Sequence, residues 1–149
     1  MQTELPRPNA QAFVRGGAMA PHLTGTVRFY QKKNGVLVIA RICRLPQNNP
    51  SGFFAMHIHE GESCSGNEFS ATGVHFDPGS RPHPDHAGDL PPLLSCGGSA
   101  YSAVMTNRFT VKDIIDRTVV IHSGPDDFRS QPAGNSGTKI ACGAIFAIR

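Results

Sequence analysis

The sequence contains no tryptophan and only two tyrosines, and no apolar stretch approaches the ~20 residues that a bilayer-spanning helix needs. It also has no dense run of basic residues, although 14 Lys and Arg against 11 Asp and Glu give a formal net charge of +3. Nucleic-acid binding requires clustered positive charge, so we expect neither a nucleic-acid nor a membrane partner. The small positive excess would help to attract a small anion only if it surrounded the mouth of a site.

Two further absences concern targeting and cysteine pairing. Residues 1–20 lack a basic start followed by an apolar run, so we expect no secretory signal, and the cytoplasm is the default compartment. The four cysteines never form a CxxC pair, which argues against a zinc ribbon and favours disulfides. Disulfides persist in oxidising compartments and would suit a location outside the cytoplasm. The sequence leaves these two alternatives for localisation open.

Strong helix formers accumulate over no long window, whereas Gly (16) and Pro (12) together supply 28 of the 149 residues. This balance favours strands joined by many turns. Residues 24–30 alternate between apolar and polar side chains, the period-two pattern of a half-buried strand, and residues 36–42 repeat it. Between them, residues 32–35 predict a hairpin turn in which Asn34 and Gly35 supply two positions that tolerate positive φ.

Seven or eight short strands are expected, and only residues 110–116 look helical, with Thr110 as a candidate N-cap. These elements predict an all-β fold, an antiparallel sandwich or barrel. The length fits one domain over residues 1–149, with residues 1–9 as a flexible extension. The remaining expected strands are residues 10–15, 53–60, 100–105, 118–122 and 140–148.

Two long segments, residues 61–93 and 123–139, are poor in secondary-structure signals, and each begins just after a histidine. Long loops of this kind in a compact domain are usually functional. Upstream, His57 and His59 are two apart on an expected strand, so both imidazoles leave one face and can reach one ion together. In isolation, such a pair is at least as often one core histidine and one surface histidine as it is a chelating pair. The context changes this interpretation, because six of the seven histidines and one aspartate fall into these regions: His57, His59, His75, His83, His86, Asp89 and His122.

Six imidazoles and a carboxylate are too many ligands for one ion, and they suit copper and zinc. Two adjacent metals with four ligands each would have to share one residue, and only imidazole has two nitrogens placed to bridge. The sequence therefore predicts a two-metal site with a shared histidine.

Over nearly its whole length the chain resembles the copper,zinc superoxide dismutases. The motifs that carry the resemblance occur in family order: His57-Ile58-His59-Glu60, Gly73-Val74-His75-Phe76-Asp77-Pro78, His86-Ala87-Gly88-Asp89-Leu90, Val119-Val120-Ile121-His122, Gly134-Asn135-Ser136-Gly137 and Ala141-Cys142-Gly143. The resemblance implies copper held by His57, His59, His75 and His122, and zinc held by His75, His83, His86 and Asp89, with His75 as the bridge.

The resemblance also implies an Ig-like Greek-key flattened barrel and an activity, the disproportionation of superoxide to dioxygen and hydrogen peroxide by alternate reduction and oxidation of copper. Homodimers are frequent in the family, so a homodimer is one expectation. A different class of function is a copper- and zinc-binding module for metal storage or delivery, or a dismutase-like protein of low activity. Turnover of superoxide separates the two.

The resemblance also implies roles beyond metal binding for three residues. His75 would deliver a proton to the bound anion. Asp126 matches an aspartate that links one copper ligand to one zinc ligand; its alternative is a solvated acidic turn. Lys139 stands where the family usually has an arginine that draws superoxide, and its alternative is a bystander surface lysine. Lysine keeps the charge but not the planar fork, so we expect a reduced rate.

The remaining expectations concern cysteines and two further side chains. The resemblance implies a disulfide between Cys64 and Cys142. Cys43 and Cys96 are additional, and they form either a second bridge or two free buried thiols. Asp85 is an alternative zinc ligand to His86, and His22 matches no ligand position, so we expect an exposed loop residue there.

Overall fold

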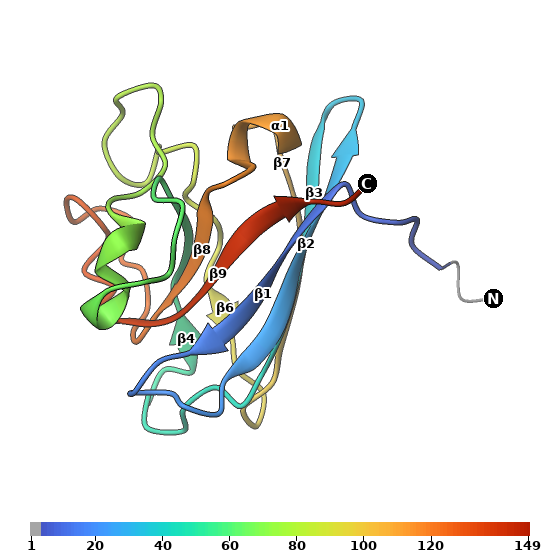
Figure 1. Cartoon of the computed structure of the whole chain (residues 1–149). Helices are drawn as coiled ribbons and strands as arrows, with labels where there is room; N and C mark the ends of the chain where they lie inside the picture. Colours follow the sequence, from blue (N-terminus) through green and yellow to red (C-terminus); the bar gives the residue numbers. More distant parts are fainter. Residues whose placement is uncertain (1–3) are drawn as a thin grey trace.

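The computed structural model describes residues 4–149, in which nine strands form a curled seven-stranded antiparallel sheet and a separate two-stranded pair (Figure 1). Apart from one α-helical turn and one 3₁₀ segment, the remainder consists of turns and loops. The elements are β1 (Ala10–Gly16), β2 (Thr24–Lys32), β3 (Gly35–Cys43), β4 (Phe53–Phe54), β5 (Met56–His59), η1 (Asn67–Thr72), β6 (Leu93–Leu94), β7 (Ala100–Thr106), α1 (Val111–Ile114), β8 (Thr118–His122) and β9 (Lys139–Ala147).

The strand order in the large sheet is β5-β8-β9-β1-β2-β3-β7. Strands β1, β2 and β3 follow one another as antiparallel neighbours. The chain then crosses to β5 at the far edge, returns to β7 beside β3, and crosses back to β8 beside β5. These long connections between non-consecutive neighbours are typical of a Greek key, which confirms the predicted all-β architecture.

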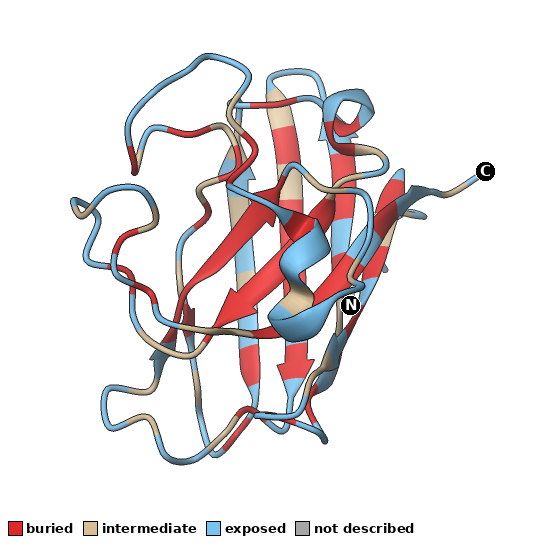
Figure 2. Cartoon of the chain, turned by 60° about the vertical axis from the view of Figure 1, so that its left-hand side comes forward, coloured by how far each residue is buried: buried red, intermediate tan, exposed pale blue. Residues whose placement is uncertain are grey.

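The core lies inside the curl of the sheet. Alternate residues along the strands point into this core. Val27 and Phe29 of β2 lie opposite Ala40 and Val38 of β3, and all four are buried. Figure 2 shows buried and less buried stretches alternating along the long strands. Their neighbours Thr26 and Arg28 face outward and are partly or fully exposed. Burying a side chain such as Phe29 contributes roughly 2 kcal/mol, so this period-two pattern fixes which face of each strand turns inward.

Strands β5 and β8 differ from the others because all of their residues are buried (Figure 2). On one face, Met56 and Ile58 of β5 join the apolar core. On the other face, His57 and His59 are buried although they lie outside that core. The two long loops gather on this side of the molecule, at the left of Figure 1, and cover the second face of the edge strand.

The observed elements differ from the predicted ones in three places. The hairpin pairs Lys32 with Gly35, so its turn consists of Lys33 and Asn34, and only Gly35 has a positive φ. The predicted strand 53–60 is split, because residues 53–54 pair with β6 while β5 pairs with β8. The predicted helix is shortened to α1, whose start is fixed by the Thr110 N–H donating to Asp113.

Two short elements, η1 and β6, were not predicted. The expected N-terminal extension falls partly on residues 1–3, which lie outside the described residues, whereas Asn9 is bonded to the sheet through its N–H and the carbonyl of Phe29. None of the helices in residues 4–149 has the length and apolar character that crossing a bilayer requires.

A disulfide joins Cys64 in the first long loop to Cys142 in β9, as the resemblance implied. Cys43 and Cys96 are both free and exposed, so the second bridge is not formed, and the alternative of two buried thiols is also wrong. Cys43 is the last residue of β3 and pairs through its backbone with Thr24 of β2, whereas Cys96 lies in the loop before β7 and pairs through its backbone with Ser99.

We expect the Cys64→Ser, Cys142→Ser double variant to lose up to about 4 kcal/mol of unfolding free energy, because the bond closes a loop of 78 residues. Urea unfolding of the oxidised proteins measures the loss. The Cys43→Ser, Cys96→Ser double variant is the matched control and should stay within about 0.5 kcal/mol of the parent. An equal loss in both variants would contradict the assigned pairing.

Candidate metal centre

The first two histidines are placed by the alternation of β5. Met56 and Ile58 are held in the core, so His57 and His59 must both leave the opposite face of the strand. Antiparallel pairing with β8 sets His57 opposite Val120 and His59 opposite Thr118. The predicted side-by-side placement of these two imidazoles is therefore present, with ring centroids 6.3 Å apart.

The loop of residues 61–93 returns along β5 as an irregular strand and brings two more ligands. Its backbone pairs His75 with His59 and Asp89 with His57. The Ile58 N–H donates to the carbonyl of Gly88 at 2.8 Å, and a side chain at Gly88 would place its Cβ 2.2 Å from the carbonyl oxygen of Ile58. Only glycine allows this approach, so Gly88 sets the distance between the loop and the strand.

The remaining residues come from the end of β8 and from the second long loop. The register of β8 against β9 shifts between Ile121 and His122, and the His122 N–H donates to the carbonyl of Ala55. Asp126 follows four residues later and is buried. It is therefore not the solvated acidic turn that was its alternative.

Four imidazoles form a first group, in which one ring nitrogen each of His57, His59, His75 and His122 lies within 4.8 Å of all the others. The Nε2 atoms of His59 and His122 are 3.3 Å apart. His59 Nδ1 donates to the carbonyl of Gly73 at 2.9 Å, so in the neutral ring Nε2 carries a lone pair.

A second group gathers around Asp89. His75 Nδ1 lies 2.8 Å from Asp89 Oδ1, and His83 Nδ1 lies 3.0 Å from Asp89 Oδ2. His86 Nδ1 is 3.1 Å from Asp89 Oδ2 and 3.3 Å from His75 Nδ1, so it belongs to the same cluster. A ring nitrogen of His57 also lies within 4.8 Å of His75, His83 and Asp89, because the two groups are adjacent. By distance His57 and His75 both belong to the two groups, but Nε2 of His57 is bonded to Asp126, so His75 is the ring that can offer one nitrogen to each group.

Asp126 fixes the protonation of two of these rings. Its Oδ2 accepts from His57 Nε2 at 2.9 Å, and its Oδ1 accepts from His83 Nε2 at 2.8 Å. Each neutral ring is thereby protonated at Nε2 and carries its lone pair on Nδ1. Both Nδ1 atoms, and Nε2 of His75, are buried without a hydrogen-bond partner.

This arrangement fits bound cations. The lone pair of His83 Nδ1 points at a carboxylate oxygen 3.0 Å away, which is repulsive unless a positive charge lies between them. Nε2 of His59 lies 3.3 Å from Nε2 of His122, and lone pairs on both atoms would repel each other in the same way. Three imidazoles and a carboxylate in the second group match a tetrahedral zinc site, and four imidazoles in the first group suit copper.

Burial keeps three of the imidazoles in their neutral, metal-binding form. It lowers the pKa of His59 to about 2 and that of His122 to about 3, and it also lowers the pKa of His75. Burial alone would raise the pKa of Asp126, but the hydrogen bonds from His57, His83 and the Phe128 N–H outweigh it and hold this pKa below its ordinary value. Asp126 is therefore ionised at neutral pH.

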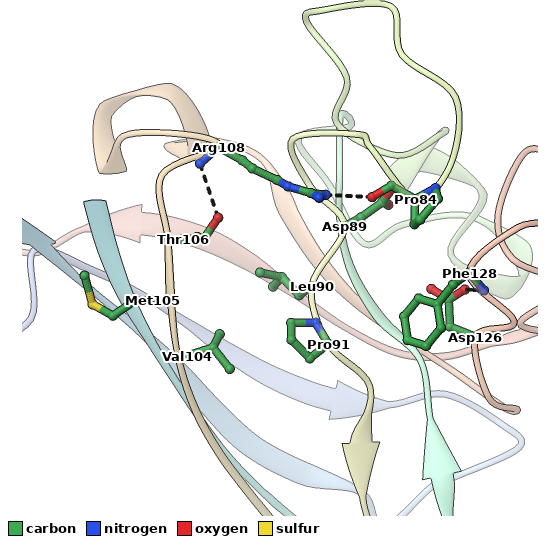
Figure 3. A pocket seen from close by; sticks show the side chains of 10 residues that line it. All are labelled: Pro84, Asp89, Leu90, Pro91, Val104, Met105, Thr106, Arg108, Asp126 and Phe128. Atoms are coloured by element: carbon green, nitrogen blue, oxygen red, sulfur yellow. Dashed lines mark hydrogen bonds between the residues drawn. The ribbon is translucent and has the colours of Figure 1, made fainter. Parts of the chain in front are cut away.

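Two residues that the sequence did not single out hold the turn that carries His83 and His86. The side-chain amide of Gln131 donates to the carbonyl of His83 at 2.7 Å, and its oxygen accepts from the His83 N–H at 2.8 Å. Arg108 Nη1 donates to the carbonyl of Pro84 (Figure 3) and to that of His86. These contacts are made to backbone atoms, so no spacing motif in the sequence could have revealed them.

A cavity of about 360 Å³ lies between β7 and the two long loops. Figure 3 shows the side chains that line it. Asp89 and Asp126 lie on its wall, together with apolar side chains such as Leu90 and Phe128. The cavity therefore borders these two carboxylates, and no histidine of the described residues lines it.

Lys139 lies opposite His122 at the start of β9. Its ammonium donates to Thr72 Oγ1 at 2.8 Å and to the carbonyl of Gly73 at 2.9 Å, and burial lowers its pKa. It is thus fixed beside the first group instead of extending into solvent. Among the other candidates, Asp85 is exposed and belongs to neither cluster, and His22 is exposed as expected.

A curled antiparallel Greek-key sheet with two adjacent histidine groups, to both of which His75 belongs, defines a two-metal β-barrel protein. A family model described as copper/zinc superoxide dismutase matches residues 23–145. The chain therefore belongs to the copper/zinc superoxide dismutase family.

Individual relatives agree with this assignment. The chain is 33% identical over 136 residues to the Cu-Zn superoxide dismutase 1 of Aquifex aeolicus, covering 81% of this chain and 79% of that one. It is 32% identical over 148 residues to the Cu-Zn superoxide dismutase of Deinococcus radiodurans, with 85% and 79% covered. The superoxide dismutase-like protein YojM of Bacillus subtilis is 30% identical over 112 residues, with 65% and 57% covered.

Among solved structures, the Cu/Zn superoxide dismutase from Brucella abortus superposes with a TM-score of 0.76 at 24% identity and covers 91% of this chain and 98% of its own. At this identity the likeness shows the fold. A double mutant of a dismutase-like protein from Bacillus subtilis gives a TM-score of 0.75 at 25% identity, with 92% and 97% covered.

We expect Gly134→Ala to lower zinc affinity about 10- to 100-fold. Gly134 has φ 73°, and a Cβ there would lie 2.0 Å from Asp126 Oδ1 and 2.6 Å from His83 Nε2, so it would displace the carboxylate from the ring. Competition with a chromophoric chelator measures the affinity. Gly97→Ala is the matched control: φ is 59°, nothing lies within 4 Å, and only backbone strain of about 1 kcal/mol is added. Equal affinities in the two variants would contradict the role given to Asp126.

We also expect the chelator-treated protein to lose stability as the pH falls from 7 to 5. The folded-state pKa values of about 2 for His59 and about 3 for His122 lie below the unfolded value of ~6.5, so below that pH the unfolded chain binds protons that the folded chain excludes. Each of the two histidines then removes up to about 1.4 kcal/mol per pH unit. Urea unfolding at each pH gives the slope, which should be shallower in His59→Gln and unchanged in His22→Gln. A flat profile for the parent would contradict this expectation.

Proposed function

We propose that this protein is an active copper,zinc superoxide dismutase. The observation that carries the proposal is the position of His75, whose Nδ1 lies in the Asp89 cluster while its ring also belongs to the four-imidazole group. A store for a single metal has no need of a ligand shared between two sites. The complete donor set, with seven residues and orphaned ring nitrogens on His57, His75 and His83, is what a linked pair of metals requires.

In the proposed assignment, copper is held by His57, His59, His75 and His122, and zinc by His75, His83, His86 and Asp89. The bound metals would supply the one-electron exchange and the fixed positive charge that disproportionation of superoxide needs. The protein itself supplies the orientation of the rings. Asp126 holds His57 and His83 in the tautomers that present Nδ1, so one carboxylate orients a ligand of each metal.

The reaction converts two superoxide anions and two protons into dioxygen and hydrogen peroxide. His75 Nε2 is buried and has no hydrogen-bond partner, so it is a position at which a proton can be held close to the anion. Lys139 places one ammonium beside the same group and favours the approach of a small anion. A single ammonium cannot pair with an anion in two directions as a guanidinium can, so Lys139 favours a lower rate than arginine would give.

The alternative function is metal storage or delivery, or a low-activity dismutase-like protein. The relative named as dismutase-like and the lysine at position 139 support this alternative. Metal binding is common to both functions, so only turnover distinguishes them.

The test is reconstitution of the full chain with copper and zinc, followed by metal analysis, electron paramagnetic resonance and a superoxide-loss assay. We expect one copper and one zinc per chain and a rate well above that of free copper. His59→Ala should lose copper and activity, whereas His22→Ala, which changes an exposed histidine, should keep both. Full metallation without a rate above the free-copper control would favour the storage function.

A further inference from the structure

Thr72 makes an unusual set of contacts for a fully buried hydroxyl. Its Oγ1 donates to the carbonyl of Phe69 at 2.8 Å, and the same oxygen accepts a hydrogen bond from Lys139 Nζ at 2.8 Å. A hydroxyl has one proton, so the bond to Phe69 turns its lone pairs toward the ammonium. The Phe69 carbonyl therefore sets the direction of the Thr72 hydroxyl independently of Lys139.

The loop that presents Thr72 is held on both sides. Glu68 and Phe69 both have positive φ values, 51° and 58°, which turn the chain so that the Phe69 carbonyl faces Thr72. The Phe69 ring lies against the backbone of Gly17, where a Cβ would be 2.9 Å from the ring. The carbonyl of Thr72 accepts from the Gly61 N–H at 2.8 Å. Together with the Cys64–Cys142 disulfide, these contacts leave Thr72 little freedom to shift.

The next residue connects Lys139 to the metal centre. The carbonyl of Gly73 accepts from Lys139 Nζ at 2.9 Å and from His59 Nδ1 at 2.9 Å. The ammonium and the first-group histidine therefore share one acceptor. Thr72 supplies the second point that holds the ammonium, and with only one of the two points the flexible lysine side chain could swing away from the centre.

We propose that Thr72 is a positioning residue for Lys139, holding its ammonium beside the four-imidazole group so that a small anion meets a fixed positive charge there. This inference rests on the proposed function for its catalytic consequence, whereas the anion-binding consequence does not require turnover. A hydrogen bond to a charged group is worth about a tenfold change in an equilibrium constant, so the effect is measurable.

The experiment compares Thr72→Val, which keeps the shape of the side chain and removes the hydroxyl, with Thr72→Ser, which keeps the hydroxyl and removes the methyl group. Azide is the anion probe, and its dissociation constant for the copper- and zinc-loaded full chain is followed by copper absorption. We expect Thr72→Val to weaken azide binding about three- to tenfold and to flatten the dependence of kcat/KM on ionic strength. Thr72→Ser should stay within about twofold of the parent.

Lys139→Met and the Thr72→Val, Lys139→Met double variant complete a cycle. If Thr72 acts through Lys139, the double variant binds azide no more weakly than Lys139→Met alone. Azide affinity that is unchanged in Thr72→Val, or equally weakened in Thr72→Ser, would overturn the inference, and so would additive losses in the cycle. A parent protein that binds azide but does not turn over superoxide would count against the proposed function only, since the azide comparison still decides the role of Thr72.

Discussion

The carboxylate of Asp126 is the contact on which the rest of the centre depends. It is buried, ionised and bonded through separate oxygens to His57 of β5 and to His83 of the loop that returns along β5. Both rings are thereby forced to carry their lone pairs on the nitrogens that face the metal positions. Without Asp126, each of the two rings could carry its proton on Nδ1. The nitrogen that faces the metal position would then have no lone pair, although all seven side chains were correctly placed.

The barrel makes that contact reachable by giving β5 two different faces. One face anchors Met56 and Ile58 in the apolar core, and the other carries His57 and His59 under the loops. Backbone hydrogen bonds through Gly88 and Phe76 hold the returning loop against the same strand. The rigid packing on the core side therefore determines the spacing of the ligands on the loop side, which a site carried by loops alone could not maintain.

The sequence allowed much of this to be predicted, because the decisive patterns are local or carried by motifs. The alternation in β2, β3 and β5 predicted the strands and the shared face of His57 and His59, and the family motifs pointed to the Cys64–Cys142 bond. The errors arose where tertiary pairing decides: the hairpin turn moved to Lys33 and Asn34, and residues 53–60 divided between two partner strands. Gln131, Arg108 and Thr72 were missed because their contacts are to backbone atoms or to one side chain far away in the chain.

The distance along the chain between the members of the first group bears on how the molecule is made. His59 and His122 meet although 63 positions separate them, and Lys139 arrives later still, with β9. During synthesis, a chain that has emerged only as far as β5 holds half of a chelating set, and no ion can be captured by the full set until β8 has been translated and paired. Full loading of the four-imidazole group is therefore a step that follows translation of β8, whereas the residues of the second group have all emerged by Asp89.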